Sequence, residues 1–136
     1  MSAISSSSFF VGSLRAIRGA LGYHAGVGMG GTVTQVTDRA TGVTINKVCG
    51  QITTDNTSLA AEGSADFVVT NSKVGAKDVV VVNIASGVVG VGTIVSVAAV
   101  AAGSFTIRVH NGNVAAGTAE TGAIVINFAV IKGSST

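Results

Sequence analysis

The stretch AGSFTIRVHNGN, residues 102–113, alternates apolar and polar side chains and has turn residues at both ends. Successive side chains of an extended chain point to opposite faces, so three apolar residues share one face: Phe105, Ile107 and Val109. The opposite face carries Arg108 and His110. The alternation predicts a half-buried β-strand whose polar side faces water or a neighbouring subunit.

Strand-like segments separated by turn residues continue through most of the chain after residue 31. Further segments rich in Val, Ile, Thr or Phe lie between Gly-, Asn-, Asp- or Ser-containing turns: 32–38, 42–47, 51–54, 65–71, 79–85, 93–100 and 123–131. Short strands at this spacing are typical of all-β sandwiches. Together with the opening stretch they make eight strands, the number found in a jelly roll. We therefore expect residues 32–136 to form an antiparallel, jelly-roll-like β-sandwich.

Two of these segments are apolar on both faces. In the first, Val79 and Val81 face away from the predicted inward set of Val80, Val82 and Ile84. In the last segment the inward set is Ile124, Ile126, Phe128 and Val130, and the second face holds Val125, Ala129 and Ile131. Strands that are apolar on both faces are usually covered on both faces. The pattern predicts that another subunit, or its N-terminal arm, covers the outer face.

Residues 1–31 differ from the rest and read as an extended N-terminal arm. They are rich in Ser and Gly, and their apolar residues have the spacing of a short helix around 8–20: Phe9, Phe10, Leu14, Ile17 and Leu21. Arg15 and Arg18 would lie on the opposite side of this helix. A helix of that length is marginal alone in water, so we expect the arm to become ordered against a neighbour.

Composition limits the function classes. The 136 residues fit one domain, and they are 47% hydrophobic but only 10% charged, where soluble domains carry about 25%. No proline protects a sheet edge. Both features favour an assembled protein. The apolar runs are too short to span a membrane, and the scattered Lys and Arg with a net charge of +2 predict no nucleic-acid partner.

Motifs that could carry chemistry are weak. Gly26, Gly28 and Gly31 match G-x-G-x-x-G, but a β-like run follows where a nucleotide site needs a helix, so we interpret them as a hinge. The lone Cys49 reads as a small buried hydrophobe. A Cys/His pair with His110 would make a small hydrolase, which is the competing hypothesis. We expect no catalytic, metal or cofactor site and no enzyme activity.

Several runs together resemble a domain that recurs in virion proteins of tailed bacteriophages. They are GTVTQVTDRATGVTINKVCGQITT (31–54), FVVTNSKV (67–74), DVVVVNIASG (78–87), VSVAAVAAGSFTIRVHN (95–111) and AIVINFAVIKG (123–133). The resemblance covers residues 31–133 and implies a β-sandwich of the kind found in capsid decoration (cement) proteins and in fibre modules. It offers no residue-level site, and it does not extend to residues 1–30.

The resemblance implies a small structural protein on the outside of an icosahedral phage head, made in the host cytoplasm and assembled as a homotrimer. Its partner would be the major capsid protein, whose capsomer contacts it would stabilise. We expect the arm to bind the capsid through six residues: Phe9, Phe10, Leu14, Arg15, Ile17 and Arg18. The alternative is a receptor- or glycan-binding fibre module that uses the loop residues Asn111, Asn113 and Glu120.

Overall fold

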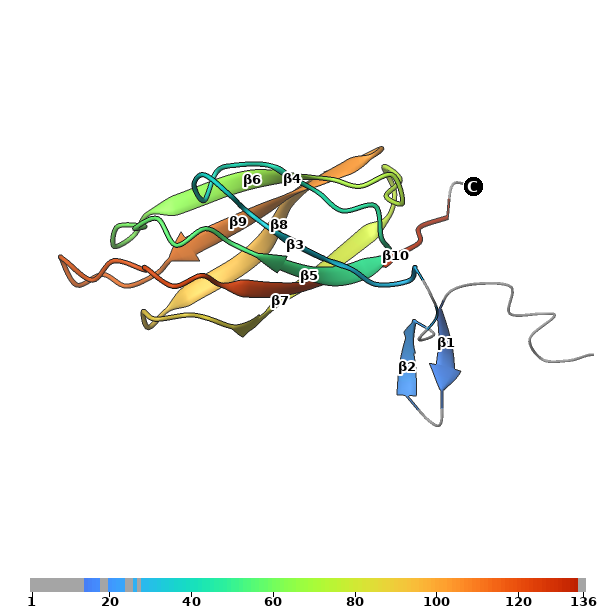
Figure 1. Ribbon diagram of the computed structural model, residues 1–136, viewed down its shortest axis with the longest axis horizontal. Coiled ribbons are helices and arrows are strands. Elements are labelled where there is room, and N and C mark those ends of the chain that lie inside the picture. The colour runs from blue at the N-terminus through green and yellow to red at the C-terminus, as the bar shows by residue number, and fades with distance from the viewer. Residues whose placement is uncertain (1–13, 18–19, 24–25, 27, 135–136) are drawn as a thin grey trace, which may run out of the picture.

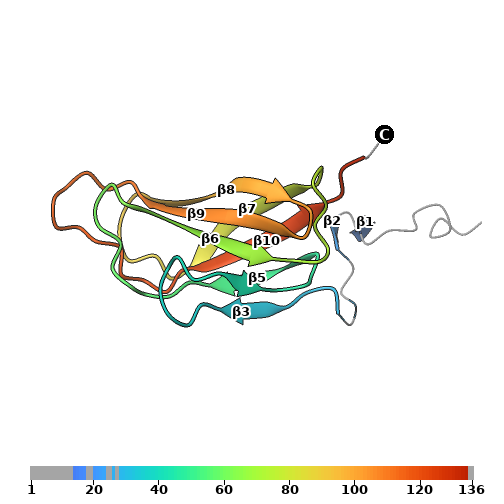
Figure 2. The same ribbon diagram turned by 90° about the horizontal axis from the view of Figure 1, so that it is seen from above.

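Two four-stranded β-sheets pack face to face as a sandwich (Figures 1 and 2). The computed structural model describes residues 14–17, 20–23, 26 and 28–134. The first sheet has the order β3-β5-β10-β7, with β3 (Thr32–Thr34), β5 (Cys49–Thr53), β10 (Val125–Ile131) and β7 (Val79–Ser86). The second has the order β4-β6-β9-β8, with β4 (Val43–Thr44), β6 (Ser64–Thr70), β9 (Ser104–Asn111) and β8 (Thr93–Ala101).

The all-β sandwich expected from the sequence is confirmed, and each of the eight predicted segments overlaps one strand. The sheets are mixed, however, where we expected antiparallel pairing throughout. The short edge strands β3 and β4 pair in parallel with β5 and β6, whereas the other pairings in both sheets are antiparallel. Alternation within a strand reports which residues face inward, but it carries no information on the direction of a neighbouring strand.

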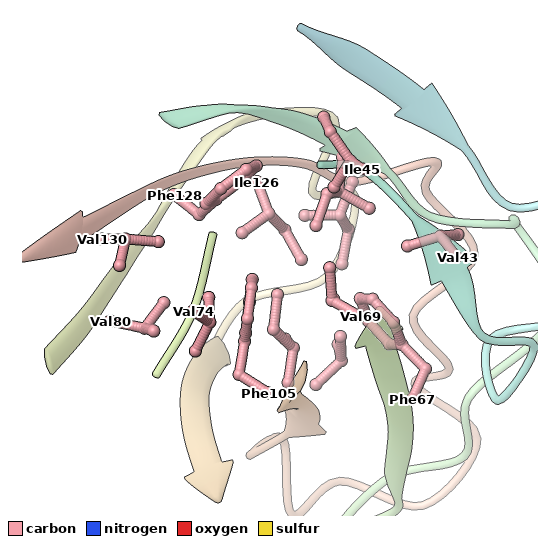
Figure 3. Close-up of a cluster of buried hydrophobic side chains, with 14 of the residues drawn as sticks. Val43, Ile45, Phe67, Val69, Val74, Val80, Phe105, Ile126, Phe128 and Val130 are labelled. Carbon is pink, nitrogen blue, oxygen red and sulfur yellow. The ribbon is translucent and has the colours of Figure 1, made fainter. Parts of the chain in front are cut away.

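The core lies between the sheets and includes the predicted inward faces of β9 and β10 (Figure 3). On β9 the inward set Phe105, Ile107 and Val109 is at most 1% exposed. The predicted set at the end of the chain, from Ile124 to Val130, is equally buried. The rings of Phe105 and Phe128 contact each other across the layers, with centroids 5.6 Å apart. Alternating burial therefore fixes the register of both central strands.

The N-terminal segment differs from the predicted helix in the part that the structure describes. There, β1 (Leu14–Ile17) and β2 (Ala20–Tyr23) pair as an antiparallel hairpin, which lies beside one end of the sandwich (Figure 1). The segment is rich in Gly and Ser, which form helices poorly, and a helix of about 13 residues is marginal. Residues 8–13 and 18–19 of the predicted helix lie outside the described residues.

Two glycines of the motif that we interpreted as a hinge are hydrogen-bonded to the sandwich. The Nζ of Lys47 donates to the carbonyl of Gly28 at 3.0 Å, and the carbonyl of Gly31 accepts from the N–H of Gln51 at 2.9 Å. Gly28 adopts a φ of 85°, a left-handed conformation that favours glycine. Residues 28–31 thus lead directly into β3.

Candidate interaction surface

Exposed valines occur on three loops at one end of the sandwich. The β7–β8 loop, residues 87–92, carries Val88, Val89 and Val91 with exposed fractions of 36%, 69% and 76%. Val114 on the β9–β10 loop and Val36 on the β3–β4 loop are about as exposed as Val91. We call these five residues the valine tip. Large apolar side chains gathered on the surface of a soluble domain indicate an interaction site.

A buried carboxylate holds the β7–β8 loop of the valine tip in place. Glu120 is 0% exposed, and its Oε1 accepts from the N–H groups of Val89 at 3.0 Å and Gly122 at 2.8 Å. Its Oε2 accepts from the N–H of Gly90 at 3.0 Å and the hydroxyl of Thr93 at 2.6 Å. Burial alone raises the pKa of Glu120, but these hydrogen bonds outweigh it and lower the pKa. The loop is therefore fixed by charge-assisted bonds.

A buried arginine ties three further loops together beneath the same end. Arg39 is 3% exposed, and its guanidinium donates to the carbonyls of Glu120 and Gly122 at 3.2 and 2.8 Å. It also donates to the carbonyl of Thr57 and to the hydroxyl of Thr54. Burial lowers the pKa of Arg39, and the charge of Glu120 opposes that shift. Every one of these contacts is internal, so the valines stand on a rigid base.

Close packing of two loops adds to this rigidity. Gly87 has a φ of 87° and lies against residue 123, so a Cβ there would overlap the carbonyl oxygen of Ala123. A Cβ on Gly122 would likewise overlap the carbonyl oxygen of Gly87. Only glycine permits this approach of the β7–β8 and β9–β10 loops.

A second apolar surface follows one long side of the molecule. The strands β7 and β8 are the last strands of their sheets, and they contact each other along this side (Figure 2). This side is flanked by Val79 and Val81 on the outer face of the first sheet and by Ile94 on the outer face of the second, which are 56%, 49% and 56% exposed. No charged residue occurs between Asp78 and Arg108, a stretch that includes both strands. We call this surface the β7/β8 side.

The outer face of the second sheet also carries a group of paired polar side chains on β6 and β9. Arg108 on β9 forms a bidentate ion pair with Asp66 on β6, with both N–O distances at 2.7 Å. His110 Nδ1 lies 2.9 Å from the hydroxyl of Ser64, also across β6 and β9. The polar residues of the opening stretch are thus paired across strands on an exposed sheet face.

The structure does not bring Cys49 and His110 together. Cys49 lies on β5 of the first sheet and His110 on β9 of the second, and the neighbour of His110 is Ser64. Burial raises the pKa of the Cys49 thiol, which disfavours the nucleophilic thiolate. This arrangement does not supply the Cys/His pair of the hydrolase hypothesis.

The residues named for the glycan-binding alternative are largely enclosed. Asn111 is 0% exposed, and its Nδ2 donates to the carbonyls of Leu59, Ala60 and Thr118 at 3.0, 3.2 and 2.9 Å. Glu120 is also 0% exposed and is occupied by the loop N–H groups. Neither side chain can reach a sugar, so the expectation that they bind one is wrong. Both residues support loops, a role that turn-like sequence did not reveal.

The six arm residues predicted to bind a capsid remain a prediction. Leu14, Arg15 and Ile17 belong to β1, whereas Phe9, Phe10 and Arg18 lie outside the described residues. The valine tip was not predicted, although the run GVVGVG at residues 87–92 contains the signal for it. A turn with three valines and no polar side chain is unusual for a solvated loop.

Within residues 14–17, 20–23, 26 and 28–134, no group of three or more potential metal ligands occurs. The same part of the chain contains no helix that is long and apolar enough to cross a membrane. No protein-family model, curated protein or solved structure matches the chain.

Proposed function

We propose that this chain is a structural virion protein that decorates the outside of a phage head and reinforces the contacts between capsomers. The observation that carries the proposal is the valine tip, a set of exposed apolar side chains on loops that buried Glu120 and Arg39 hold rigidly. A pre-organised apolar surface binds with little ordering cost. The resemblance of the strands to phage virion domains supports the same role.

The size of the apolar tip indicates weak binding by a single copy. Burying a valine side chain fully contributes about 1.5–3 kcal/mol. The three valines of the β7–β8 loop are only partly exposed to begin with, so together they contribute about 3–5 kcal/mol. A free energy of about 4 kcal/mol corresponds to millimolar affinity. Firm attachment therefore needs several linked copies, or the arm, acting together on a repeating lattice.

Co-sedimentation with empty, expanded phage heads that lack the protein tests this role. The double variant Val89→Asp/Val91→Asp is expected to lose at least about tenfold in head affinity, since each carboxylate would be desolvated at the contact. A chain without residues 1–20 should stay folded and also bind more weakly. Val68→Asp is the matched control, because Val68 is 47% exposed on the outer face of β6, away from the tip.

The proposal fails if wild-type protein does not bind heads, or if both the tip variant and the truncated chain bind as wild type does. Loss of binding by the truncated chain alone would assign the contact to the arm. The fibre-module alternative predicts binding to host cells or glycans in place of heads. No residue of the described surface favours it specifically, since two of its three named residues are buried.

A further inference from the structure

The free sheet edges on the β7/β8 side lack most of the features that normally protect an edge. No strand in the part of the chain that the structure describes pairs with the outer edge of β7 or of β8. Native proteins protect such edges with Lys, Pro, short strands or a covering segment. β7 and β8 are eight and nine residues long and contain neither proline nor a charged residue. The edges on the opposite side, β3 and β4, have only three and two residues.

The inward side chains of these two strands are also incompletely covered. Val82 and Ile84 on β7, and Val95, Val97 and Val100 on β8, are only partly buried although they pack against the core. On the central strands β9 and β10 the inward residues are almost fully buried. The core is therefore exposed to solvent along this side, and covering it would bury apolar area at about 25 cal/mol per Å².

We propose that the β7/β8 side is the interface of a twofold dimer, in which β7 of one copy pairs antiparallel with β7 of a second copy. A twofold axis perpendicular to the sheets would place both edges of one molecule against the same edges of the other. The surface is then self-complementary, as a closed dimer requires. An uncharged strand can meet its own copy without like-charge repulsion.

The regular part of β7 makes it the pairing strand. Its pairing with β10 is regular from Val79 to Ile84, and the irregularity lies next to the end of the strand. β8 has an irregularity in its middle, between Val97 and Ala99, which disfavours continuous pairing along its free edge. β8 therefore contributes apolar packing, and β7 contributes the backbone hydrogen bonds.

The area of this side fits a dimer of moderate affinity. A strand of nine residues is about 30 Å long. Two sheets about 10 Å apart, together with their side chains, make the β7/β8 side about 18 Å wide. The side therefore has an area of about 500 Å² per copy. The dimer would bury about 1,000 Å² in total, close to the lower limit for a specific interface. We expect dissociation in the micromolar range. A threefold ring would have to join this side to a different surface, and the short β3 and β4 edges offer no matching strand.

Sedimentation-velocity measurements on the full chain across micromolar concentrations test the proposal. Val81→Lys and Ser96→Lys place an ammonium group on each edge strand at exposed positions, and together they should weaken the dimer at least about tenfold. Val68→Lys is the matched control, because Val68 has a similar exposure on an inner strand of the second sheet. Circular dichroism should show the same strand content for all of these variants. Their melting should agree at concentrations low enough for every chain to be monomeric, because dimer formation adds to the apparent stability.

A further variant separates edge pairing from stacking of sheet faces. Ile131 lies on β10, directly opposite Val79 and 42% exposed on the outer face of the first sheet. Ile131→Lys should leave an edge-paired dimer intact and should abolish one that stacks by this face.

The proposal is overturned by a chain that stays monomeric at high micromolar concentration or forms trimers. A dimer that the edge variants do not weaken, or that Ile131→Lys dissociates, overturns it too. The dimer does not depend on the proposed role on a phage head.

Discussion

Buried polar residues of this sandwich act as loop anchors. Arg39, Asn111 and Glu120 are each at most 3% exposed, and each binds backbone groups of loops that are distant in sequence. Among the described residues no buried side-chain nitrogen or oxygen lacks a hydrogen-bond partner. Breaking one such network leaves buried donors or acceptors unsatisfied, which costs about 1–3 kcal/mol for each group.

The Glu120 carboxylate allows this cost to be measured. In Glu120→Gln one oxygen becomes an NH₂ group that faces N–H or O–H donors, so we expect a loss of about 2 kcal/mol in the free energy of unfolding. Urea denaturation measures the change. Glu62→Gln is the control, because Glu62 is exposed and should change stability by less than about 0.5 kcal/mol. Equal effects at both positions would contradict the anchoring role.

At the scale of elements, alternation predicted where the strands lie and which residues they bury. The inward sets of β7, β9 and β10 follow from period-two spacing because each strand has one face on the core. The parallel edge strands were not predictable in this way, since their pairing depends on how the 35–42 loop crosses between sheets. The N-terminal hairpin was missed because the same apolar residues fit either a helical or an extended spacing.

The exposed and the anchoring residues show the same division between what could and could not be predicted. The exposed Val79 and Val81 were evident as the second apolar face of a strand, and the structure confirms their exposure. The anchors Arg39 and Glu120 were not evident, because a charged residue in a turn is normally solvated. Their burial depends on loops that meet only in three dimensions.

The close contact of Gly87 with Ala123 predicts that a side chain at position 87 destabilises the β7–β8 loop. Gly87→Ala combines left-handed strain of about 1–2 kcal/mol with overlap on the carbonyl oxygen of Ala123, so we expect a total loss of about 3–4 kcal/mol. Gly103→Ala is a matched control, since Gly103 has a φ of 82° but no atom within 4 Å of the added Cβ. Gly103→Ala should lower the free energy of unfolding only by the left-handed strain of about 1–2 kcal/mol. Thermal unfolding of the two variants compares them, and equal melting temperatures would contradict the close-packing argument.

Across the whole molecule, favourable contacts of the carboxylates link stability to pH. The pKa values of Asp55, Asp66 and Glu120 lie below their usual range, and hydrogen bonding from Lys132 is the main cause that lowers the pKa of Asp78 to about 2. Asp78 also accepts from the N–H groups of Gly75 and Gly133, which connects the start of β7 to the end of β10.

We expect the free energy of unfolding to fall in acid. A folded-state pKa of about 2 for Asp78, against an ordinary value of 3.8, stabilises the fold fully above pH 3.8. That stabilisation is lost as the pH falls through about 2. Urea titrations between neutral pH and pH 2 measure the slope, which Asp78→Asn should reduce. An unchanged slope in this variant would show that Asp78 does not contribute to it.

The enclosure of Asn111 has a consequence for chemical ageing. Asn-Gly is the dipeptide that deamidates most readily, through attack of the glycine nitrogen on the asparagine amide carbon. In this fold three carbonyl oxygens hold the Asn111 amide, and the N–H of Gly112 donates to the carbonyl of Gly92 at 3.1 Å. Neither reactant can turn toward the other, so the succinimide cannot close while β9 and its loops stay folded. Long storage should leave this site unaltered by mass spectrometry, and the +1 Da product should accumulate there only in unfolded chains.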